Sequence, residues 1–151
     1  MPAHIVSGDA ARPMRGAFVM RILDRKGNVL EAYEDHNMIV NLARISMSML
    51  VSEGTAEKIV TKFAVGTNNA TATPTDTELT EAYINDIVGH SFPEDGTVKF
   101  EWKLDYDEAN GKNITEFGLL SADGTLFSRK VRAAIAKADD IAFEGEWSII
   151  F

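Results

Sequence analysis

The sequence predicts a mainly β protein, an antiparallel β-sandwich of jelly-roll-like type with one α-helix around residues 38–51 and an extended N-terminal arm. Three observations support this fold class. About seven or eight strand-like segments follow one another at short, turn-rich intervals. Residues 98–105 alternate strictly between apolar and charged side chains, and the crossover helices that join parallel strands are missing.

The chain is long enough for one domain with its own hydrophobic core. It has 151 residues, of which 45% are hydrophobic, and it contains no cysteine. Disulfides, thiol nucleophiles and cysteine-built metal sites are therefore excluded. Residues 1–15 contain Pro2, Gly8 and Pro13 among small and polar residues, which predicts a flexible arm. We expect a single β-sandwich domain over residues 16–151.

The first two strands are expected to form a hairpin. Residues 17–23 and 29–33 have strand-like composition, and the polar segment between them contains Gly27, which can supply the positive φ of a tight turn. A helix is predicted next, from Asn37 to Val51, with Gly54 as its stop signal. Its apolar stripe is wide, so we expect most of the helix to be buried. The stripe consists of Met38, Leu42, Ile45 and Met49.

A long polar loop is predicted in the middle of the chain. Residues 59–65 are typical of a short buried strand that ends at Gly66, and residues 67–76 are small and polar. The loop lacks the Gly-Lys pair that would hold phosphates. Two interpretations remain open: a surface excursion without a role, or a contact loop, since loops of this length are often functional.

The second half of the chain is predicted to consist of strands. The alternating segment 98–104 leads through Asn110-Gly111, the strongest hairpin signal in the chain, to a partner strand at 114–120. A second tight turn at Asp123-Gly124 leads to residues 126–135. The last segment, 141–151, is apolar on one face, so we expect it to lie inside the sheet rather than at an exposed edge.

Charge and hydropathy exclude two classes of partner. The formal net charge is -8 and the acidic residues are spread along the chain, which argues against nucleic acid because phosphate binding needs clustered Lys and Arg. The densest basic stretch is 128–132, where Arg129 and Arg132 fall on opposite faces of a strand. No segment approaches the length of a membrane span, and residues 1–9 do not resemble a signal peptide.

No catalytic or cofactor-binding residues are predicted. His4, His36 and His90 lack a second histidine at metal-ligand spacing, and the serines lack the Gly-x-Ser-x-Gly pattern of an exposed nucleophile. We therefore expect a protein that is not an enzyme and carries no cofactor.

Two acidic features are worth testing. Asp105, Asp107 and Glu116 fall at positions 1, 3 and 12 of a calcium-loop count, although Ala109 and Asn110 do not suit positions 5 and 6. They are a weak candidate for a metal site. Glu116 also lies inside an apolar strand, where the carboxylate is either satisfied by backbone N–H groups or an arginine, or serves a subunit contact or catalysis.

The order of several short motifs resembles a group of phage virion proteins. In the first half these are Asn37-Met38-Ile39-Val40-Asn41, Phe63-Ala64-Val65-Gly66-Thr67 and Thr75-Asp76-Thr77-Glu78-Leu79. In the second half they are Asn110-Gly111, Ile114-Thr115-Glu116-Phe117-Gly118-Leu119, Asp123-Gly124-Thr125-Leu126-Phe127-Ser128-Arg129 and Trp147-Ser148-Ile149-Ile150-Phe151. Together they are similar to tail-collar and tail-fibre attachment domains and to small capsid decoration (cement) proteins.

The resemblance implies a structural component of a virion, made in the cytoplasm of the host. Its partners would be other virion proteins, the major capsid protein or tail proteins, and it would itself form a homo-oligomer, with a trimer favoured by analogy. The arm and the loop would supply the contacts. The residues we expect to touch partners are Pro2, His4, Ile5, Val6, Asn68, Asn69, Thr73 and Pro74.

Two other functions compete with this one. A carbohydrate-binding module of a receptor-binding tip would use exposed aromatic rings such as Trp102, Tyr106 or Tyr83, although the alternation around Trp102 predicts that its ring faces inward. A small hydrolase would use a pair of carboxylates, but no spacing in the sequence selects a pair.

Overall fold

The structure is a computed structural model and describes residues 13–151. Within this range the chain forms nine β-strands, one α-helix and a short 3-10 helix. The strands and helices are β1 (Arg15–Leu23), β2 (Val29–Ile39), α1 (Asn41–Glu53), η1 (Ala56–Lys58), β3 (Val60–Gly66), β4 (Tyr83–Asp86), β5 (Gly89–Glu94), β6 (Thr97–Leu104), β7 (Asn113–Ser121), β8 (Leu126–Ala136) and β9 (Ala142–Ile150).

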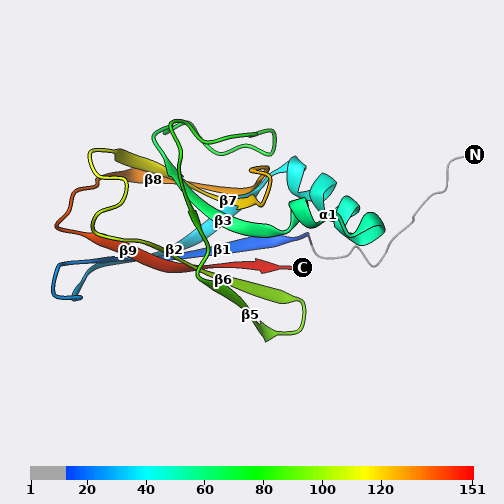
Figure 1. Ribbon diagram of the computed structural model, residues 1–151, viewed down its shortest axis with the longest axis horizontal. Coiled ribbons are helices and arrows are strands. Elements are labelled where there is room, and N and C mark those ends of the chain that lie inside the picture. Colours follow the sequence, from blue (N-terminus) through cyan, green and yellow to red (C-terminus); the bar gives the residue numbers. More distant parts are fainter. Residues whose placement is uncertain (1–12) are drawn as a thin grey trace, which may run out of the picture.

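All nine strands belong to one antiparallel sheet in the order β4-β3-β7-β8-β2-β1-β9-β6-β5. The sheet curls strongly, so that β3, β7 and β8 lie over β1, β9 and β6, with β2 running from one layer to the other (Figure 1). The prediction of a mainly β protein with a helix in the 38–51 region is thereby confirmed. The two layers are connected through β2, where Met38 pairs with Arg129 and Ile39 with Ser128.

The two edge strands of the sheet are consecutive in the chain. β4 pairs with β3, β5 pairs with β6, and the short link between them bonds to both sides. The Ile87 N–H donates to the Thr61 carbonyl at 3.0 Å, and the Val88 N–H donates to the Glu101 carbonyl at 2.8 Å. The segment 83–94 therefore bridges the open side of the curl.

An aromatic stack fills the space between the two layers. The Trp102 ring of β6 lies parallel to the Phe63 ring of β3 at 4.2 Å between centroids, and at 5.5 Å from Phe18 of β1. Trp102 is 1% exposed, so the inward orientation predicted from its alternation is confirmed. Offset stacking of this kind stabilises a core beyond the area it buries.

The helix begins later than the sequence pattern predicts. Asn37 to Ile39 belong to β2, and α1 starts at Asn41. The helical spacing of Met38 is accidental, because pairing with β8 satisfies the backbone of this segment in the extended form. The predicted stop at Gly54 is confirmed: this residue has a left-handed φ of 62° and its N–H caps the helix by donating to the Leu50 carbonyl.

The expectation that most of α1 is buried was wrong. Its buried residues are Ala43 and Ser46, whereas Ile45 is 56% and Val51 is 89% exposed. An amphipathic helix normally turns its apolar stripe toward the core. The helix α1 therefore leaves apolar side chains exposed to solvent.

The turn signals had mixed outcomes. The hairpin of β1 and β2 is confirmed, with a φ of 81° at Gly27. The hairpin through Asp123-Gly124 is confirmed as β7 and β8. The hairpin through Asn110-Gly111 was wrong: β6 pairs with β9 and β5, whereas β7 pairs with β3 and β8, so this turn connects the two layers. The last strand, β9, lies between β1 and β6 as expected.

Candidate functional site

The loop between β3 and β4, residues 67–82, is fixed to the sheet although it forms neither helix nor strand. We call it the anchored loop. Leu79 inserts into a small apolar cluster with Val40, Ala64, Leu120 and Leu126. The Thr67 N–H donates to the Thr80 carbonyl at 3.1 Å, which closes the base of the loop. The loop is thus held at both of its ends.

A buried ion pair lies under the anchored loop. Glu116 of β7 is 0% exposed and Arg129 of β8 is 2% exposed. Arg129 Nε donates to Glu116 Oε1 at 2.9 Å. The other carboxylate oxygen, Oε2, accepts the backbone N–H groups of Asn68 at 2.9 Å and Thr80 at 2.8 Å. Of the interpretations left open for Glu116, the structure shows a carboxylate satisfied within the chain, by an arginine and by backbone N–H groups together.

The guanidinium of Arg129 also bonds to the loop itself. Nη1 donates to Asp76 Oδ2 at 2.9 Å, and Nη2 donates to the Asn68 carbonyl at 3.2 Å. Burial alone would raise the pKa of Asp76, but hydrogen bonds from the Thr73 N–H, the Thr73 hydroxyl and Arg129 outweigh it and hold this pKa below its usual value. Asp76 is therefore anionic at neutral pH and completes the anchor.

The outer part of the anchored loop faces solvent beside a shallow hollow. Asn69, Thr73 and Pro74 are exposed, and Asn68 is half-buried. The hollow has a volume of about 340 Å³ and lies between the loop, β2 and β8. Its lining combines apolar surface from Met38, Ala72 and Val131 with the polar side chains of His36, Asn37, Asn69, Thr71, Arg129 and Lys130.

Half of the predicted partner contacts lie in this loop. Asn68, Asn69, Thr73 and Pro74 all belong to it, and the Pro74 carbonyl accepts the N–H of Asn41 at 2.8 Å, which joins the loop tip to the start of α1. The other predicted contacts, Pro2, His4, Ile5 and Val6, lie outside the described residues.

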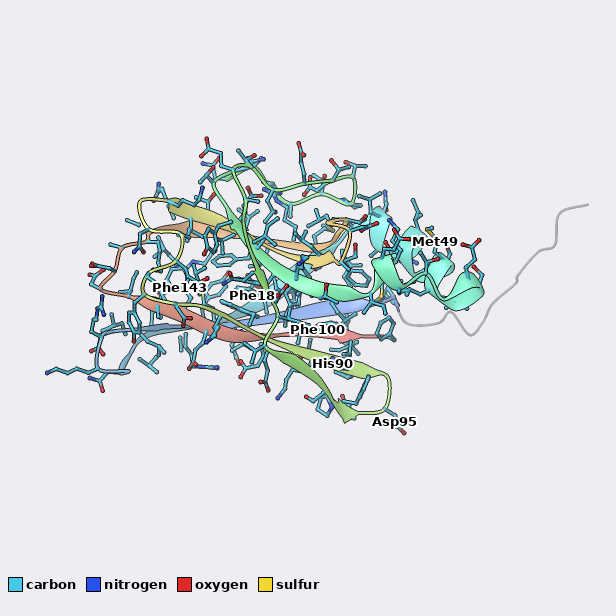
Figure 2. The ribbon with its side chains drawn as sticks, viewed as in Figure 1. Phe18, Met49, His90, Asp95, Phe100 and Phe143 are labelled. Atoms are coloured by element: carbon cyan, nitrogen blue, oxygen red, sulfur yellow. The ribbon has the colours of Figure 1, made fainter. Side chains whose placement is uncertain are left out.

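A second surface, an apolar groove of about 360 Å³, lies at the end of the molecule beside α1. Figure 2 shows Met49 of α1 and Asp95 at the tip of the β5–β6 hairpin at this end, on either side of the end of β9. The polar members of the lining are Thr61 and His90. The apolar walls include Met47, Leu50, Ile59, Phe92, Val98 and Phe151.

The groove exposes large apolar side chains to solvent. Phe92 is 73%, Phe151 59% and Ile59 49% exposed. Clustered apolar exposure of this kind typically marks an interaction surface. Sequence reasoning missed the groove because β5 has a polar, proline-containing sequence that does not alternate, and because α1 was expected to be buried.

The weak calcium candidates are not brought together. Glu116 is bonded to Arg129 under the loop, whereas the backbone N–H of Asp105 bonds to Glu108 in the turn after β6. Across residues 13–151, no three His, Cys, Asp or Glu side chains are grouped in a way that could hold a metal ion.

The aromatic rings expected of a sugar site are largely occupied inside the protein. Trp102 is buried, the Tyr83 hydroxyl donates to Glu108 at 3.0 Å, and the Tyr106 hydroxyl donates to the Asp24 carbonyl. Within residues 13–151, the phenylalanine rings exposed to solvent are those of Phe92 and Phe151 in the groove.

No protein-family model matches this chain, and no curated protein or solved structure matches it either. In the part of the chain that the structure describes, no helix has the length and apolar character needed to cross a membrane.

Proposed function

We propose that this chain is a non-enzymatic structural protein of a phage virion that binds other capsid or tail proteins. It would act as a capsid decoration (cement) protein or as a neck, collar or baseplate component, and as a homo-oligomer with a trimer favoured. In this proposal the two layers of the curled sheet serve as the jelly-roll-like sandwich that the sequence predicts. The arm predicted for residues 1–15 is the part before Met14, because Met14 packs against the core and Arg15 belongs to β1.

The observation that carries the proposal is the anchored loop. A surface loop without a role does not require a buried ion pair, since charged groups are costly to remove from water unless they are fully paired. Glu116 and Arg129 direct four hydrogen bonds into this loop, to Asn68, Asp76 and Thr80. A loop whose conformation is fixed in advance loses little entropy on binding, which favours a contact role.

The motif order supports the same proposal. Three of the segments that resemble virion proteins, around Gly66, Asp76 and Glu116, meet at the anchored loop, and the segment that ends at Arg129 joins them there. Four of the segments that carry the resemblance thus build the loop and its anchor.

The first test is binding to particles. Particles of the phage that encodes the chain, assembled with this gene inactivated, are sedimented with increasing amounts of purified protein. We expect saturable binding at a fixed copy number per particle. Absence of binding to these particles would refute the proposal, and binding to a surface polysaccharide instead would support the carbohydrate-binding alternative.

A matched pair of variants locates the contact. Ala70 is exposed in the anchored loop, and Ala134 is exposed on β8 away from it. Ala70→Arg should weaken particle binding by about tenfold or more, whereas Ala134→Arg should leave it unchanged. Equal binding of the two variants would show that the loop is not the contact.

A further inference from the structure

We propose that the apolar groove receives residues 3–6 of a second copy of this chain, so that the copies of the oligomer are joined by exchanged N-terminal segments. This inference rests on the proposed function for the homo-oligomer, and it adds the surface of the neighbouring copy that accepts the arm. The proposed contact between copies involves the groove beside α1 and not the anchored loop.

The groove requires an apolar occupant. Its walls include Leu50 from α1, Ile59 before β3, Phe92 from β5 and Phe151 after β9. Leaving such a concave apolar surface in water is unfavourable by about 25 cal/mol for each Å² that a partner could cover. Water is a poor occupant, since the polar members of the lining are Thr61 and His90.

The sequence just outside the described residues has matching chemistry. Residues 1–8 contain no Asp, Glu, Lys or Arg, and Ile5-Val6 is an adjacent pair of β-branched apolar residues. Such residues favour an extended backbone, which suits a groove lined by strands on one side. A segment with charged residues at these positions would not suit these walls.

The segment also joins the described chain next to the groove. Arg15, the first residue of β1, pairs with Ile150, and Met14 packs against the core. Phe151, which follows Ile150 directly, lines the groove. Val6 and Met14 are eight positions apart, which allows a span of up to about 28 Å. Residues 3–6 can therefore reach beyond the end of their own molecule.

Two features favour a second copy over the chain's own groove. Arg12 precedes Pro13, and the bias of a residue before proline toward extended backbone disfavours a sharp reversal of the chain at this point. In addition, Phe92, Phe151 and Ile59 in the groove lining remain 73%, 59% and 49% exposed. A neighbouring copy brings enough surface to cover them, whereas a four-residue segment folded back does not.

Exchange of this kind passes from one copy to the next around a closed ring. In the proposed trimer, the three groove ends would meet around the symmetry axis, with each segment inserted into its neighbour. The arrangement predicts contact between residue 5 of one copy and α1 of another.

The absence of cysteine from the sequence makes this contact directly testable. Full-length chains carrying Ile5→Cys are mixed with full-length chains carrying Met47→Cys, oxidised, and separated without reducing agent. Ile45→Cys replaces Met47→Cys in the control, because Ile45 lies on the opposite face of α1 and is itself 56% exposed. We expect a disulfide between the two chains that exceeds the control by about tenfold.

A chain carrying both Ile5→Cys and Met47→Cys distinguishes the arrangements. Exchange around a ring should give a ladder of linked chains whose largest closed species is a trimer. A disulfide confined within single chains would overturn the exchange, and cross-linking no stronger than with Ile45→Cys would overturn the groove as acceptor. Either result could accompany intact particle binding that depends on Ala70, and in that case the proposed function stands while this inference fails.

Discussion

The anchored loop and the apolar groove differ in polarity, in regular structure and in how far the single chain covers their side chains. The loop is polar and has little regular structure, yet Glu116 and Arg129 fix it from below through buried charge. The groove is built from regular helix and strands, yet its apolar side chains remain in water. The loop is complete in the single chain, whereas the groove is not. We infer from this difference that the loop presents a preformed surface to a partner, and that the apolar side chains of the groove become covered when a partner binds.

The largest expected effect comes from breaking the buried ion pair. Arg129→Met would leave the Glu116 carboxylate buried beside only backbone donors, and removal of one partner from a buried pair costs about 3–5 kcal/mol. Urea denaturation measures the loss. Lys62→Met is the matched control, because Lys62 pairs with Asp86 at the surface and such pairs contribute about 0–1 kcal/mol. Equal losses in the two variants would show that the buried pair is not the main anchor.

The next effect tests the close approach of the loop to β3. A Cβ at Gly66 would lie 2.6 Å from Glu116 Oε2 and 2.7 Å from the Thr80 carbonyl. Gly66→Ala should therefore displace the base of the loop and reduce the free energy of unfolding by about 1–3 kcal/mol. In Gly89→Ala, another strand glycine, the new Cβ meets nothing within 4 Å. The same denaturation measurement should show no loss for Gly89→Ala, and a loss as large as that of Gly66→Ala would contradict the steric argument.

These two predictions show what the sequence could and could not supply. The carboxylate of Glu116 in an apolar strand requires polar partners, and the two candidates considered, backbone N–H groups or an arginine, are both present. Its identity as Arg129 depends on the register of β7 against β8, which a sequence pattern does not fix. For the same reason the Asn110-Gly111 signal predicted a local hairpin where the chain crosses between layers.

The sequence did not predict the groove, and the physical reason is different. Periodicity identifies the apolar face of an element, but not whether another part of the chain covers it. The apolar side chains of α1 and the isolated Phe92 of β5 form one surface because the fold brings the helix and this edge strand to the same groove. That placement depends on contacts between segments far apart in the sequence.

Acid should affect the loop before the groove. The pKa of Asp76 is held below its usual value of 3.8, so its anchoring contribution is present above that pH and is lost as the pH falls through the lowered pKa. NMR should show the Thr73 amide signal, which reports the bond from its N–H to Asp76, moving below about pH 4. The methyl signals of Met47 and Leu50 in the groove should stay constant over this range. Simultaneous movement would indicate global unfolding and not release of the loop.

The smallest expected effect on stability lies in the groove. Phe92 is 73% exposed, so Phe92→Ser removes little buried area and should change the free energy of unfolding of the isolated chain by about 0.5 kcal/mol or less. Its effect should appear instead in self-association, because an apolar wall of the proposed acceptor is lost. Sedimentation velocity over a range of concentrations measures this, with Leu30→Ser as control, since Leu30 is 60% exposed at the opposite end of β2. A groove that serves folding of the single chain would give the reverse result, a marked loss of stability with unchanged association. The two surfaces would then share one role, and the contrast between a completed loop and an open groove would not hold.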